Sequence, residues 1–148
     1  MQWVYDDGGR KAAGYRGDTG DCVVRAVTIA TQQPYERVYA TLAIGVSTER
    51  RSKYSRTRRP SARNGVHTSR KWFKDYMKGL GWHWTPTMGI GTGCTVHLKA
   101  DELPSGRLIV ALSCHYVAVV DGILHDLSEC SREGTRCVYG YYRKEVTD

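Results

Sequence analysis

The stretch "HYVAVVDGILHD", residues 115–126, decides the expected fold of this chain. Its two apolar runs flank the dipeptide Asp121-Gly122, a strong short-range signal for a two-residue β-hairpin turn. A turn there places Val120 opposite Ile123. It also fixes the register, because a slip of one residue would move every side chain to the other face. The sequence therefore predicts an antiparallel pair of strands over this stretch.

This register brings a histidine and a carboxylate together. Val117 falls opposite Asp126, and residues two apart share a face, so His115 lies on the same face as Asp126. The two side chains are then diagonal neighbours within hydrogen-bonding reach. Asp121 is the alternative carboxylate, but its place in the turn points it at solvent. A carboxylate bonded to one imidazole nitrogen fixes the tautomer and leaves the other nitrogen for a second partner.

The stretch "GDTGDCVVRA", residues 17–26, supplies a thiol for that second nitrogen. A glycine-punctuated turn leads into Cys22, where an apolar helical pattern begins, with Thr19 or Asp21 as the expected N-cap. A thiol at a helix N-terminus beside a protonated histidine has a lowered pKa, and nearby backbone N–H groups can stabilise an oxyanion. The candidate catalytic residues are therefore Cys22, His115 and Asp126.

The rest of the chain predicts helices followed by strands. Helices are expected over residues 21–31, 32–45 and 68–79, with Gly45 ending the second. A short strand is expected at residues 3–5, and further β-type runs from residue 82 onward: "WHW", "CTVHL", "RLIVALS", "HYVAVV", "ILHD" and "RCVYGYY". This order predicts a single α+β domain over residues 1–148, with N-terminal helices packed on a C-terminal antiparallel sheet.

The positive charge is concentrated in one segment. The chain has 22 Lys and Arg against 15 Asp and Glu, a net charge of +7, and residues 50–78 hold 11 of the basic residues with one acid. An exposed insert at about 46–66 is expected to bind nucleic acid or an acidic protein, the alternative being a solvated loop without a partner. The candidate polyanion-binding residues are Arg50, Arg51, Lys53, Arg56, Arg58, Arg59 and Arg63.

The five cysteines are odd in number and are not spaced like a disulfide scaffold. Without an export signal or an apolar run long enough to cross a membrane, we expect reduced thiols, a cytoplasmic protein and no membrane partner. Cys114 should pack behind the site, because adjacent strand residues face opposite ways. The thiols expected to be structural are Cys94, Cys130 and Cys137.

A zinc site is the alternative role for part of this set. Cys94 and His97 have a C-x-x-H spacing, and Cys130 with Cys137 would complete four ligands. These residues lie in or beside apparent strands, and the chain has no paired C-x-x-C knuckle, so a structural zinc is disfavoured. We therefore expect no metal and no cofactor.

The order of Cys22, His115 and Asp126 resembles that of the papain-like cysteine peptidase superfamily. "GDCVVRA" and "HYVAVVDGILHD" are similar to compact bacterial members, and "GTGCTVHLKADELPSGRLIV" with "GTRCVYGYY" resembles an uncharacterised family of small bacterial and phage proteins. The resemblance implies a papain-like fold and a peptidase, amidase or acyl transferase that acts on a protein or peptide through an acyl-enzyme. Cys22 would be the nucleophile, His115 the base and then the acid, and Asp126 the residue that orients the ring.

The chain departs from this pattern at the oxyanion hole. Papain-like enzymes usually place a glutamine or another donor shortly before the cysteine, but "GYRGDTGD" contains no glutamine. The candidate donors are Arg16, Thr19 and backbone N–H groups, and loss of one donor costs about 100- to 1,000-fold in turnover. The alternative function is a non-enzymatic module that binds a polyanion through the basic insert, with Cys22 as a structural thiol.

Overall fold

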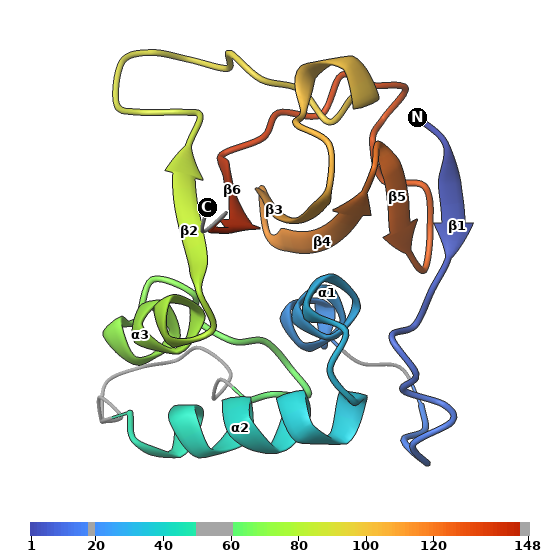
Figure 1. The fold of residues 1–148 in the computed structure, drawn as a ribbon, viewed down its shortest axis with the longest axis vertical. Coiled ribbons are helices and arrows are strands. Elements are labelled where there is room, and N and C mark those ends of the chain that lie inside the picture. The colour runs from blue at the N-terminus through green and yellow to red at the C-terminus, as the bar shows by residue number, and fades with distance from the viewer. Residues whose placement is uncertain (18–19, 50–60, 146–148) are drawn as a thin grey trace.

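The computed structural model describes residues 1–17, 20–49 and 61–145 (Figure 1). Its helices are α1 (Cys22–Thr31), α2 (Tyr35–Ser47), α3 (Lys71–Gly79) and the short 3-10 helix η1 (Ala100–Glu102). Its strands are β1 (Trp3–Tyr5), β2 (Trp82–Pro86), β3 (Arg107–Leu112), β4 (His115–Val120), β5 (Ile123–Asp126) and β6 (Gly140–Lys144). The predicted α+β class is confirmed. Within the described ranges, no helix combines the length and apolarity that a membrane span requires.

The strands form one sheet in the order β1-β5-β4-β3-β6-β2. The pairings among β2 to β6 are antiparallel, but β1 joins β5 in parallel. The expected C-terminal antiparallel sheet is therefore extended at this edge by a parallel N-terminal strand, where the start of the chain runs beside β5 (Figure 1). A short strand there covers backbone groups that β5 would otherwise leave unpaired.

The hairpin between β4 and β5 has the predicted register. Val120 pairs with Ile123 and Ala118 with His125. Asp121 and Gly122 adopt φ angles of 48° and 78°, the two positive values that a tight two-residue hairpin turn requires. The turn residues and the apolar alternation therefore specify the same register, which explains why this hairpin could be predicted from the sequence.

The sheet lies between the helices on one face and the long β2–β3 connection on the other (Figure 1). Helix α1 packs against β4, and all its residues from Val23 to Ala30 are buried. This burial stabilises a helix whose β-branched residues have modest intrinsic propensity. On the far face, Leu98 and Leu103 of the connection share a core with residues of β3, β4 and β5. Helix α1 lies between α2 and the sheet and contacts both.

Helix α2 does not end at Gly45, as expected, but continues to Ser47. The glycine serves a packing purpose, because a Cβ at Gly45 would lie 2.3 Å from ring atoms of Trp72 on α3. The ring rests on the backbone of α2, and its Nε1 donates a hydrogen bond to Glu49 at 2.9 Å. The glycine marks a close contact between two helices and not a helix end.

The segment "CTVHL" is not a strand, and "RCVYGYY" becomes one only from Gly140. An isolated bridge pairs His97 with Cys137, and Cys94 and Cys137 form a disulfide with their Cα atoms 5.8 Å apart. The expectation of reduced thiols is therefore wrong for this pair. The two cysteines are 43 residues apart, and only the packing of their segments brings the sulfurs together.

Candidate active site

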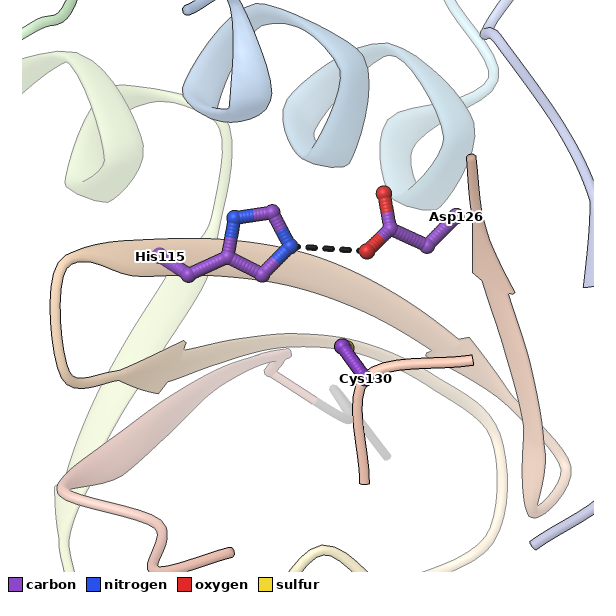
Figure 2. Close-up of side chains that lie close together, drawn as sticks. All are labelled: His115, Asp126 and Cys130. Carbon is purple, nitrogen blue, oxygen red and sulfur yellow. Dashed lines mark hydrogen bonds and ion pairs between the residues drawn. The ribbon is translucent and has the colours of Figure 1, made fainter. Parts of the chain in front are cut away.

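The site is built on the β4–β5 hairpin, with His115 as the first residue of β4 and Asp126 as the last of β5. The register brings the two side chains together, and His115 Nε2 lies 2.7 Å from Asp126 Oδ2 (Figure 2). Asp126 is buried, and the His115 side chain is 20% exposed. One edge of the ring is therefore held by protein while the ring keeps access to solvent.

Cys22 reaches the same ring from the first residue of α1. The second ring nitrogen of His115 lies on the edge that faces α1 (Figure 2). The His115 side chain is close enough to the Cys22 sulfur to lower the pKa of this thiol. The backbone N–H of Tyr116 lowers the pKa of this thiol as well. The three predicted site residues therefore lie together in the structure. They come from helix α1 and from the β4–β5 hairpin, which are far apart in the sequence.

Electrostatics at Cys22 favour a thiolate. Burial alone raises the pKa of Cys22, but the hydrogen bonds from His115 and the Tyr116 N–H lower it. The positive charges of His115 and Arg25 act in the same direction, so that the net pKa of Cys22 is below its ordinary value.

The pKa values of His115 and Asp126 also shift, in opposite directions. Burial lowers the pKa of His115, but hydrogen bonds with Asp126, Cys130 and Cys22 raise it to about 11. Burial raises the pKa of Asp126, yet the hydrogen bond and charge of His115 hold it below the ordinary value. These shifts favour an imidazolium beside the Asp126 carboxylate, and the lowered pKa of Cys22 favours its thiolate form.

A buried ion network underlies the site. Asp21 occupies the N-cap position of α1, as one of the two expected caps, but it does not make the expected side-chain capping bond. Its carboxylate instead pairs with Arg25 and accepts a 2.5 Å hydrogen bond from Tyr35. Arg25 Nη2 then lies 3.3 Å from Asp126 Oδ1. Asp21 is used to anchor Arg25 under the site, which leaves the N–H groups of the first helical turn without this cap.

A cleft of about 1150 Å³ opens onto Cys22 and His115. One wall is aromatic and includes Trp84 of β2 and Tyr139, each 41% exposed. The described residues that line it include Lys74 and Lys78 of α3 but no carboxylate. The cleft therefore offers aromatic surface and positive charge beside the thiol.

Of the two side chains expected as oxyanion donors, the structure describes Arg16 and places it away from the cleft. Arg16 is exposed, lies outside the described lining, and its carbonyl accepts a 2.8 Å hydrogen bond from Arg10. Thr19 lies outside the described residues. Asn64, which sequence reasoning missed, lines the cleft beside Gly20, where an added Cβ would lie 3.1 Å from the Asn64 carbonyl oxygen. No spacing in the sequence links residue 64 to the helix start.

The two other free cysteines near His115 differ from expectation. Cys114 is exposed and lines the cleft, because the chain turns there with a φ of 55° and strand alternation does not apply. Cys130, expected to be structural, lies beside His115 and Asp126 (Figure 2), with its sulfur within 4.8 Å of one ring nitrogen of His115 and one carboxylate oxygen of Asp126. Residues 127–139 contain no named strand in the structure, so no register could have placed Cys130 in advance.

Most of the basic insert lies outside the described residues. This applies to Arg50, Arg51, Lys53, Arg56, Arg58 and Arg59. Arg63 is exposed, and its Nη2 would lie 3.4 Å from a Cβ added at Gly17. Polyanion binding by this segment stays a prediction.

Comparisons with protein-family models, with curated proteins and with solved structures found no match for this chain. Its function is therefore inferred from the chemistry of the site and not from relatives.

Proposed function

We propose that this protein is a cysteine-dependent hydrolase or acyl transferase with a papain-like catalytic site. The observation that carries the proposal is the position of His115, which hydrogen-bonds with Asp126 and lies beside the Cys22 thiol in one cleft. A nucleophile at a helix N-terminus, a base within reach and a carboxylate that orients the base are the parts that acyl transfer requires. The order of helices before the sheet strands β2 to β6 supports a papain-like arrangement.

The chemistry follows from this arrangement. His115 holds the thiol proton, and the Cys22 sulfur attacks the carbonyl carbon of an amide or thioester to form a C–S bond. The oxyanion lies at the N-terminus of α1, where the Cys22 N–H is a candidate donor, and Asn64, which lines the cleft beside Gly20, is a second candidate. His115 then protonates the leaving group as the C–N or C–S bond of the substrate breaks. Water, or an acceptor amine, gives a proton to His115 and releases the acyl group.

The cleft favours a peptide or protein substrate. Its volume of about 1150 Å³ is larger than most small metabolites need, and its aromatic wall offers apolar contact along a chain. An extended acyl group bound there ends at Cys22.

Reactivity of the thiol provides the test. We expect iodoacetamide to label Cys22 rapidly at neutral pH. The labelling rate should stay high well below pH about 8.5, the ordinary pKa of a cysteine, because the imidazolium lowers the pKa of Cys22. His115→Ala should shift this profile upward in pH. Peptide mass mapping separates Cys22 from the exposed Cys114, which serves as an internal control.

A second measurement follows the acyl-enzyme. Incubation with a panel of peptide thioesters should add an acyl mass to Cys22 in the wild-type protein and none in Cys22→Ala. Labelling of Cys22 no faster than Cys114, together with no acyl adduct, would show that the thiol is structural.

A further inference from the structure

Cys130 has no part in the proposed reaction, yet its position is specific. Its partly buried sulfur, one nitrogen of His115 and one oxygen of Asp126 all lie within 4.8 Å of one another. Cys130 approaches the His115–Asp126 pair from the side opposite α1 (Figure 2). A thiol, an imidazole and a carboxylate in one cluster are the donor types that Zn²⁺ selects in proteins.

We propose that His115, Asp126 and Cys130 form a site for a thiophilic divalent cation, with Zn²⁺ as the best-fitting ion, and that its occupation blocks the chemistry of Cys22. The ligand atoms are His115 Nε2, Asp126 Oδ2 and the Cys130 sulfur. This second clause depends on the proposed function, whereas the binding of the ion does not. The site departs from the sequence-based expectation that the chain holds no metal.

The distances are close to what coordination needs. Ligand atoms around a tetrahedral Zn²⁺ are about 3.3–3.8 Å apart, given bonds of about 2.0–2.3 Å. The 2.7 Å contact between Nε2 and Oδ2 must widen, and the sulfur must move inward, each by about 1 Å or less on this geometry. The ion takes the place of the proton between His115 and Asp126, and that proton and the Cys130 thiol proton pass to solvent.

The surroundings leave the required atoms available. Asp126 Oδ1 accepts a 2.8 Å hydrogen bond from the Leu127 N–H and lies 3.3 Å from Arg25 Nη2. These contacts orient the carboxylate and direct Oδ2 toward the ring, as outer partners of metal-bound carboxylates do. The Arg25 charge opposes a cation nearby, but it faces the other oxygen. The partial exposure of His115 and Cys130 gives the ion a route and a fourth position for water.

Inhibition follows from the tautomer. With Zn²⁺ on Nε2, the neutral ring keeps its remaining proton on the nitrogen that faces Cys22. That nitrogen can no longer accept the thiol proton, and Asp126 no longer supports an imidazolium. Without the imidazolium charge beside it, Cys22 takes up a proton from solvent and reacts slowly, and removal of the ion restores the thiolate.

Binding is tested on the full chain with the metals alone. Calorimetry with Zn²⁺ should give one equivalent bound, and Co²⁺ should give the visible absorption of a tetrahedral thiolate complex. Cys130→Ser should weaken binding at least tenfold and abolish the thiolate band. Cys22→Ser and the matched control Cys114→Ser should keep both. A band that survives in Cys130→Ser but disappears in Cys22→Ser, or the absence of stoichiometric binding by the wild type, would overturn the proposal.

Inhibition is tested through Cys22 alkylation, which needs no substrate. Stoichiometric Zn²⁺ should slow iodoacetamide labelling of Cys22 at least tenfold in the wild type, and EDTA should restore the rate. Cys130→Ser should be insensitive at the same concentration. Equal slowing in both proteins would refute the role of Cys130. A Co²⁺ thiolate band together with a Cys22 that is unreactive even in the metal-free protein would count against the proposed hydrolase and leave the metal site standing.

Discussion

Asp126 is the residue on which most of the site's polar contacts converge. Oδ2 holds His115 at 2.7 Å, whereas Oδ1 faces Arg25 and the Leu127 N–H. A buried carboxylate with this many partners is stable as an anion, because each contact favours the charged form. The carboxylate therefore serves both the orientation of the ring and the stability of the fold.

Asp126→Asn should lower the free energy of unfolding by about 1–3 kcal/mol at pH 7, since buried donors lose a charged acceptor. The folded pKa of Asp126 is below its unfolded value of 3.8, so this contribution is present above 3.8 and is lost as the pH falls through the folded pKa. Urea denaturation from pH 7 to pH 3 should show the difference from wild type shrinking. Asp101→Asn, at an exposed position, is the control. A difference that is independent of pH would contradict the charge argument.

Asn64 offers a residue-scale test of the oxyanion hole. Asn64→Ala should lower acylation by a peptide thioester by about 100- to 1,000-fold, the usual effect of losing one donor. Alkylation by iodoacetamide should be unchanged, because that reaction forms no oxyanion. The matched control is Ser69→Ala, which also changes an exposed polar residue of the cleft. Equal loss in both reactions would mean that Asn64 supports the thiol and not the oxyanion.

At the scale of elements, the contact between α2 and α3 depends on the missing side chain of Gly45. Trp72 lies where a Cβ would be, and its hydrogen bond to Glu49 restrains the ring from moving aside. The contact between Gly45 and Trp72 therefore sets the position of α3 against α2. Helix α3 also provides Lys74 and Lys78 to the cleft, so this contact positions one wall of the site.

Gly45→Ala should destabilise the protein by about 1–3 kcal/mol, the usual cost of overpacking a close contact. Thermal unfolding followed by circular dichroism would report the lowered Tm. Gly79→Ala, also in a helix, meets no atom within 4 Å and should be neutral or stabilising by up to about 1 kcal/mol. Similar Tm values for the two variants would show that the Trp72 ring yields easily.

At the scale of the whole molecule, the cleft combines aromatic surface with uncompensated positive charge. Lys74 and Lys78 line it, and the described lining contains no carboxylate. On the same helix, Lys71 is outside the lining and pairs with Asp75 at 2.6 Å. The charge of the cleft therefore differs from that of the adjacent surface, and it favours an acidic segment in the substrate.

Peptide thioesters with acidic residues should acylate Cys22 faster than neutral ones at low salt, by about tenfold, and the advantage should fall as salt screens the charges. Lys74→Glu with Lys78→Glu should reverse the preference. Lys71→Glu changes the same charge outside the cleft and should leave it intact. Competition between acidic and basic thioesters, read by mass spectrometry, gives the ratio directly; an unchanged ratio in the double variant would refute this role for the two lysines.

Local sequence determined the β4–β5 hairpin, the start of α1 at Cys22, and the meeting of His115 with Asp126. Turn residues and apolar alternation specify these features within a dozen residues, so distant contacts are not needed to recognise them. Tertiary structure alone decided the parallel addition of β1, the disulfide, the position of Cys130 and the place of Asn64 in the cleft. These depend on packing between segments far apart in the chain, and no periodicity or spacing records which remote segment a residue will meet.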